Sequence, residues 1–384
     1  MTILTPSALA TASATASTTA SASSLASPWQ DAIAYAAAHE TSWARDPLAE
    51  PHNWGVHHGD PAPFNRLRGP VHARGGVSGV IWQQGREVAA WGEPDRADQT
   101  FSVAKTYLGM LAGVAQGQGL LPDVDEPVVK RLPGIGFDSA HNAAITWRHL
   151  LEQTSEWEGT CLGLPDTVDR YRQVAHDPKP VQGKKGDARP LQAPGSYWEY
   201  NDVRINQLAL ALLHLFRRPL PDVLRETLMV PLGVSSTWQW QGYDDAWVDV
   251  AGQRVQSVPG GTHWGAGVSI SARDQARLGQ LLLDEGMHAG QQLIPAAWVR
   301  CMRQPSAMAP FYGWLMWLNR GRSAFPAASE EASLMVGAGG NYVWIEPALQ
   351  AVVVVRWLDA SGVDGFMQRV VQPRNGGWTR PRGL

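Results

Sequence analysis

Strand-forming segments stand at both ends of this chain, and helix-forming segments lie between them. Near the start, residues 76–83 and 88–91 are rich in β-branched and aromatic residues and flank a turn at Gly85. Near the end, residues 341–346 and 351–358 repeat this pattern around a turn that contains Pro. Hairpins so far apart in sequence share a sheet only if the chain returns to its start. The order therefore predicts an α+β protein whose sheet is closed by its two terminal segments.

The strongest helical pattern covers residues 103–116. Apolar residues recur there at steps of three to four, from Ala104 to Ala115, which predicts a helix that buries one face. Similar patterns cover about 147–153 and 203–216, and a loop rich in Gly, Pro and Lys separates them. This loop carries Lys179, Lys184, Lys185 and Arg189, and it is predicted to be solvated and mobile, with an anion site as the alternative. Because it lies just before Tyr200, it could also act as a lid.

Residues 2–28 are almost wholly Ala, Ser and Thr, and a globular composition begins at Trp29. Such a segment buries too little apolar area to compensate for the entropy lost on ordering, so residues 1–28 are predicted to be a disordered tail. A secretory signal has a basic start and a compact apolar block, and this segment has neither. A cytoplasmic location is therefore predicted, and export by an unusual leader is the alternative.

Composition excludes several classes of protein. A net charge of −3 provides no bulk attraction to nucleic acid or anionic membranes, and no apolar run approaches the roughly 18 residues of a membrane span. Two cysteines, Cys161 and Cys301, cannot form a disulfide-rich scaffold or a four-cysteine metal site. His52, His57, His58 and Asp60 lie close together in the sequence and could ligate a metal, but adjacent histidines on a loop usually point apart, so no metal site is expected there. No nucleic-acid partner, membrane span, metal or cofactor is predicted.

Ser102 and Lys105 stand at the start of the strongest helix, three positions apart and hence on one face. A serine hydroxyl becomes a good nucleophile when a base takes its proton, and a lysine serves as that base if burial lowers its pKa. The helix N-terminus also favours a developing anion. Because a bare Ser-x-x-Lys spacing is common, the alternative is that Ser102 caps the helix and Lys105 is solvated.

A second candidate segment contains Tyr200 and Asp202, just before the helix at 203–216. A tyrosine beside a lysine ammonium group is more easily ionised, so Tyr200 could act as a base or proton shuttle. The alternative is that Tyr200 is a wall aromatic and that Asp202 caps the helix.

Two further segments suggest a binding cleft. Gly339 and Gly340, just before the strand at 341–346, allow a ligand to approach the backbone and an N–H group to bind an oxyanion. A bend before the strand is the equally good alternative. His263 and Trp264 precede a further glycine and are predicted to line the mouth of the cleft.

In this order, the motifs resemble those of the serine β-lactamase-like superfamily, especially its class C-related esterases, D-Ala-D-Ala peptidases and nylon-oligomer hydrolases. The resemblance covers about residues 76–358. It implies an antiparallel sheet flanked by helices, with an inserted helical subdomain. The catalytic domain would be 29–384, with an α/β part at about 29–105 and 260–384 and a helical insertion at about 106–259. The matching motifs are Phe101 to Lys105, Gly119 to Asp123, Ile145 to Leu151, Pro194 to Tyr200 and Gly265 to Asp274.

The resemblance also implies roles for individual residues. Ser102 would be the acylated nucleophile, Lys105 its base partner and Tyr200 the group that shares proton transfer. The backbone N–H of Ser102 and one from the glycine-rich strand would form the oxyanion hole. Substrate-binding residues would be Asp202, Trp264, Gly339 and Gly340. The expected protein is a serine hydrolase of the esterase or amidase type that acts on a small ester or amide without a cofactor, and its oligomeric state is left open.

Two departures from the family pattern qualify this prediction. Asp202 stands where the family has Asn, and its charge would either hold Lys105 protonated or accept a hydrogen bond from a substrate amine. The family's Lys-Thr-Gly triad falls at Met335 to Gly337, and residues 333–341 contain no Lys, Arg or His. A thioether cannot replace a charged donor, so weak or no β-lactamase activity is expected. The alternatives are a catalytically silent binding protein and a D-Ala-D-Ala peptidase or β-lactamase.

Overall fold

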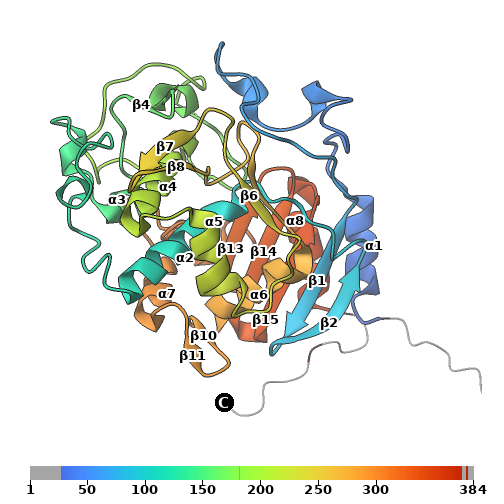
Figure 1. Cartoon of the computed structure of the whole chain (residues 1–384). Coiled ribbons are helices and arrows are strands. Elements are labelled where there is room, and N and C mark those ends of the chain that lie inside the picture. Colours follow the sequence, from blue (N-terminus) through green and yellow to red (C-terminus); the bar gives the residue numbers. More distant parts are fainter. Residues whose placement is uncertain (1–26, 181, 374–377, 379–384) are drawn as a thin grey trace, which may run out of the picture.

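The computed structural model describes residues 27–180, 182–373 and 378, so the tail predicted at 1–28 lies outside it except for two residues. Six strands form an antiparallel sheet in the order β12-β13-β14-β15-β1-β2 (Figure 1). Segments from both ends of the chain thus share one sheet, and the predicted α+β class is confirmed. The strands are β1 (Ser78–Gln83), β2 (Arg86–Trp91), β12 (Trp317–Leu318), β13 (Ser333–Gly337), β14 (Asn341–Glu346) and β15 (Ala351–Arg356).

The first hairpin shows how the sequence sets the strand pairing. Gln84 and Gly85 both have positive φ, 50° and 72°, as a tight two-residue turn requires. Gly79 in β1 faces Trp91 across the sheet. A Cβ atom on Gly79 would lie 2.2 Å from the carbonyl oxygen of Val354 and 2.3 Å from the Trp91 ring. Only glycine permits this close packing.

Helices cover both faces of the sheet (Figure 1). Because side chains alternate along a strand, Val352 and Val354 of β15 pack into the core with α2 and α6, whereas Val353 and Val355 pack into the core with α1 and α8. The α2 helix therefore lies between β13 and the helical part of the molecule. The covering helices are α1 (Gln30–Ala38), α2 (Val103–Gly117), α6 (Ala272–Leu283) and α8 (Val363–Val371).

The segments between these strands form helices and short sheets. α4 packs against α2, α3 and α5, and its residues 202–213 are all buried. No helix within the described ranges is both long and apolar enough to cross a membrane. The remaining helices are α3 (Trp147–Leu151), α4 (Asp202–Phe216), α5 (Leu220–Leu224) and α7 (Ala296–Met302). The remaining strands pair as β3 (Asp98–Gln99) with β9 (Gly267–Ile270), β9 with β6 (Gln239–Gln241), β4 (Thr160–Cys161) with β5 (Leu164–Pro165), β7 (Trp247–Val250) with β8 (Gln253–Gln256), and β10 (Met287–His288) with β11 (Gln291–Gln292).

Candidate active site

Ser102 and Lys105 meet at the N-terminus of α2. Lys105 Nζ donates a hydrogen bond to Ser102 Oγ over 2.8 Å, and the Lys105 side chain is only 1% exposed. The Ser102 side chain makes no capping hydrogen bond to the helix. The alternative of a helix cap beside a solvated lysine is therefore wrong, and the pair has the contact that proton transfer requires.

The residue before Ser102 has an unusual backbone conformation. Phe101 has φ of 53°, a left-handed conformation that costs a non-glycine residue about 1–3 kcal/mol. Its ring packs against Trp43, Trp54 and Trp357, with centroid separations of 5.2, 5.3 and 6.3 Å. This aromatic cluster stabilises the sharp turn that presents Ser102 at the helix start. The conformation has no sequence signal, since left-handed turns are typical of Gly and Asn rather than Phe.

Tyr200 lies beside this pair, with its ring centroid 4.8 Å from Lys105 Nζ. The side chain is buried, and burial raises the pKa of its phenol, which the negative charge of Asp202 raises further. Arg172 and a hydrogen bond with Ser102 act in the opposite direction without reversing the shift. The expectation of an easily ionised tyrosine is therefore wrong, because desolvation outweighs the nearby positive charges. Tyr200 is a neutral phenol, able to donate a proton.

Asp202 is held by three groups rather than acting as the cap of α4. Its Oδ1 pairs with Lys105 Nζ, and its Oδ2 lies 2.5 Å from Arg172 Nη1 and 2.8 Å from His263 Nδ1. Burial would raise the pKa of Asp202, but the charges of Lys105 and Arg172 lower it well below its usual range. The helix cap is instead Asn201, whose side chain accepts from the first backbone N–H groups of α4.

Burial lowers the pKa of Lys105, and Arg172 lowers it further, whereas Asp202 raises it. Burial dominates, so the pKa lies below the ordinary value for lysine. A lowered pKa increases the fraction of the neutral amine, which is the form of lysine that can accept a proton.

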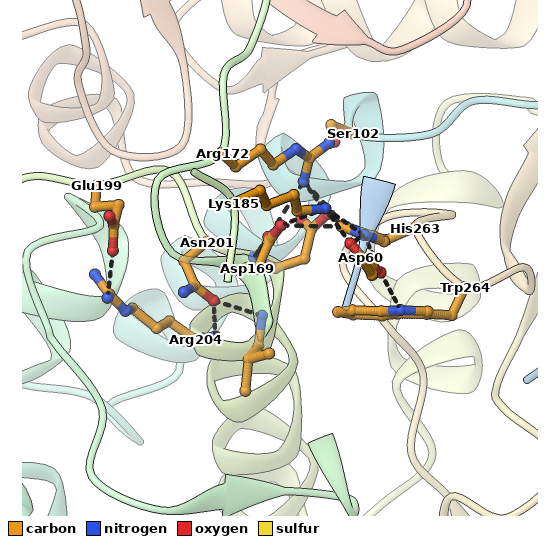
Figure 2. A network of polar contacts seen from close by, with 12 residues as sticks. Asp60, Ser102, Asp169, Arg172, Lys185, Glu199, Asn201, Arg204, His263 and Trp264 are labelled. Carbon is orange, nitrogen blue, oxygen red and sulfur yellow. Dashed lines mark hydrogen bonds and ion pairs between the residues drawn. The ribbon is translucent and has the colours of Figure 1, made fainter. Parts of the chain in front are cut away.

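A polar network continues beyond Asp202 (Figure 2). Lys185 pairs with Asp60 and lies 3.1 Å from Asp169 Oδ1, and its side chain is largely buried. The prediction of a solvated loop is therefore wrong at Lys185. Asp60, Asp169 and His263 hold potential ligand atoms within 4.8 Å of one another. The Lys185 ammonium group contacts all three, so the protein's own cation balances part of the negative charge of this cluster.

Trp264 belongs to this network rather than to the cleft. Its side chain is fully buried, and its indole N–H donates to Asp60 Oδ2 over 2.7 Å. It does not line the cleft that contains Ser102, contrary to the position expected for it. Arg172 and Asp169 also belong to this network, and neither was predicted from the sequence because neither lies in a motif.

The cleft beside Ser102 has a volume of about 280 Å³. Gly339 and Gly340 line it, and both have positive φ, 75° and 87°. The two glycines also form the β13–β14 turn, as the alternative expected, and a Cβ atom on Gly340 would lie 1.9 Å from the carbonyl oxygen of Leu358. Their role toward a ligand stays a prediction. Met335, in contrast, is buried in the core beside α2, whereas Val336 faces the cleft. The lining residues are Val56, Ser102, Arg172, Gln173, Val174, Ala175, Lys185, Tyr200, Trp317, Val336, Gly337, Ala338, Gly339, Gly340, Tyr342 and Ala360.

A sheet closed by both terminal segments, with a Ser-x-x-Lys pair beginning its central helix, defines the class of β-lactamase-like proteins. The sequence profile of the Beta-lactamase family matches residues 64–360, most of the chain. The chain therefore belongs to the Beta-lactamase family of hydrolases, and the predicted superfamily is confirmed.

Individual relatives are more distant. A 6-aminohexanoate-dimer hydrolase of Paenarthrobacter ureafaciens is 24% identical over 285 residues, which cover 68% of this chain and 66% of that relative. A penicillin-binding protein homologue of Caulobacter crescentus has a similar structure, with a TM-score of 0.55, 17% identity, and coverage of 86% of this chain and 98% of its own. EstCE1, described as a hydrolase with promiscuous acyltransferase activity, gives a TM-score of 0.55 at 19% identity, covering 77% and 93% of the two chains. These structural similarities establish the fold.

Proposed function

We propose that this protein is a serine hydrolase that cleaves a small ester or amide through an acyl-enzyme on Ser102. The observation that carries the proposal is the hydrogen bond from the buried Lys105 Nζ to the Oγ atom of Ser102, a serine that lines the cleft. Membership of the Beta-lactamase family supports the same chemistry.

In the first half of the reaction, neutral Lys105 takes the hydroxyl proton as Ser102 Oγ attacks the carbonyl carbon. The oxyanion that forms would accept hydrogen bonds from the backbone N–H of Ser102 and from one backbone N–H of residues 337–340. The positive end of the α2 dipole would stabilise the same negative charge. The neutral phenol of Tyr200 then donates a proton to the departing alcohol or amine, and Lys105 restores that proton. Water cleaves the acyl-enzyme by the same steps in reverse order.

The cleft favours an uncharged group at the scissile bond. Its lining includes the apolar side chains of Val174, Trp317 and Val336. Its two cations, Arg172 and Lys185, already pair with carboxylates of the protein. Because β13 contributes no cation to the cleft, a β-lactam carboxylate would lack the partner that the family's Lys-Thr-Gly lysine provides. Because the Paenarthrobacter relative is a 6-aminohexanoate-dimer hydrolase, linear amides are a second substrate class to test.

A catalytically silent binding protein is the second candidate. The ion pair between Lys105 and Asp202 favours it, since an ammonium group held by a carboxylate cannot accept the serine proton.

Labelling with a fluorophosphonate, read by intact mass, separates the two candidates. Catalysis predicts one adduct on the wild-type protein, none on Ser102→Ala and strongly reduced labelling of Lys105→Ala. The variant Ser323→Ala, at an exposed serine, is the matched control and should label like the wild type. Absence of an adduct from the wild-type protein at every pH would support the silent binder.

Substrate class is tested with three compounds. We expect turnover of short-chain p-nitrophenyl esters and little turnover of a chromogenic cephalosporin. Turnover of a linear 6-aminohexanoate dimer would assign amidase activity. A preference for the cephalosporin over the ester would refute the inference that Met335, in place of the family's lysine, disfavours β-lactam substrates.

A further inference from the structure

The acid at position 202 creates an electrostatic problem for the proposed base. Asp202 Oδ1 pairs directly with Lys105 Nζ, and both side chains are almost fully buried. A carboxylate at this distance stabilises the ammonium form of lysine, which holds no lone pair for the serine proton. The neutral asparagine expected at this position would not have that effect. A working base therefore requires another group to offset the charge of Asp202.

Arg172 is placed to do this. Its Nη1 lies 2.5 Å from Asp202 Oδ2 and 3.3 Å from Asp169 Oδ2, and its side chain is 7% exposed. An arginine stays charged at any pH that the folded protein survives, so its positive charge is permanent. Lys105 contacts one oxygen of Asp202, and Arg172 holds the other. The two cations thus share a single carboxylate.

The surroundings of Lys105 leave this role to Arg172. The charged and titratable groups that face Lys105 are Asp202 of α4, Tyr200 before that helix, and Arg172 and Asp169 from the segment that precedes them. His263 approaches through Asp202 Oδ2, and Lys185 is held by Asp60 and Asp169. Among these groups in the described part of the chain, Arg172 is the permanent cation that directly contacts Asp202.

We propose that Arg172 is a positioning residue that holds the outer oxygen of Asp202, so that this carboxylate orients Lys105 without fixing it as an ammonium ion. The inference rests on the proposed function, because it concerns the base of that reaction. Arg172 and Asp202 then form a pair in which the positive charge of the arginine balances the negative charge of the acid. Arg172 comes from the loop between Asp166–Asp169 and α4, so the strength of the base depends on that loop remaining docked.

The test measures the rate of fluorophosphonate labelling of Ser102 between pH 5 and 10. In Arg172→Gln, we expect the pH midpoint of labelling to rise by about one pH unit, so that labelling near neutral pH slows about tenfold and recovers at alkaline pH. Arg172→Lys keeps the charge and should keep the midpoint near that of the wild type. The double variant Arg172→Gln/Asp202→Asn removes both charges and should label faster than Arg172→Gln at pH 7.

Two results would overturn the proposal. One is a rate for Arg172→Gln that falls by the same factor at every pH, and the other is a double variant no faster than Arg172→Gln. Far-UV circular dichroism and the thermal midpoint show whether each variant folds. If Arg172→Gln does not fold, Asp202→Asn decides. Arg172, then paired with Asp169 alone, should lower the pH midpoint of labelling, and an unchanged or higher midpoint refutes the role. Failure of the wild-type protein to label at all would instead refute the proposed function.

Discussion

Gly261 offers a direct steric test of the site, because it lies against the paired side chains. A Cβ atom at this position would lie 3.1 Å from Lys105 Nζ, 3.5 Å from Ser102 Oγ and 3.7 Å from Asp202 Oδ1. The first distance is shorter than an ordinary contact, so in Gly261→Ala the lysine nitrogen must move by about 0.3–0.5 Å. A misplacement of 1 Å costs about a hundredfold in rate, so a displacement of this size predicts a loss of about tenfold.

The assay compares ester turnover, fluorophosphonate labelling and the thermal midpoint. Gly261 does not have positive φ, so alanine introduces no backbone strain, and we expect the free energy of unfolding to change by less than about 1 kcal/mol. Gly59→Ala is the matched control, since Gly59 is exposed, also lacks positive φ, and its Cβ would meet no atom within 4 Å. Activity of Gly261→Ala within twofold of the wild type would refute the placement of the pair.

Three further predictions follow from buried groups. Because burial lowers the pKa of Lys105, the neutral amine accumulates as pH rises, and labelling should increase to a plateau before pH 10.5; a flat profile would contradict its role as base. Burial alone would raise the pKa of Glu156, but Arg189 and Arg204 lower it to about 2. The ionised Glu156 should contribute about 3 kcal/mol to the free energy of unfolding above pH 4.5, and this contribution should be lost as pH falls through about 2. The difference in unfolding free energy between the wild type and Glu156→Gln, measured in urea, should therefore shrink over that range. A difference that stays constant with pH would argue against this prediction. Met335→Lys should lose about 3–5 kcal/mol of stability and gain no cephalosporin turnover, because the new charge lies in the core; a stable variant that hydrolyses cephalosporin would show the opposite.

Local patterns in the sequence were sufficient for much of the fold. The strand Asn341–Glu346 was predicted with its observed bounds, and the helix predicted at 103–116 ends only one residue later. The contact between Ser102 and Lys105 also follows from spacing, since residues three apart share a helical face. These features depend on neighbours within one turn or one hairpin, which the order of residues specifies directly.

The environment of the pair was decided by the tertiary structure. Arg172 and Lys185 come from one loop, whereas His263 lies about 80 residues further along the chain, and these side chains meet around Asp60 and Asp202 only when separate segments pack together. No periodicity in the sequence predicts such contacts. A charged residue on a loop is therefore predicted to be solvated until the structure shows its partner.

Desolvation likewise depends on the whole fold. It raises the pKa of Tyr200 and lowers the pKa of Lys105, because the charged form of each loses the stabilisation that water provides. The sequence thus determined which groups stand at the start of the helix, and the packing around them shifted their pKa values.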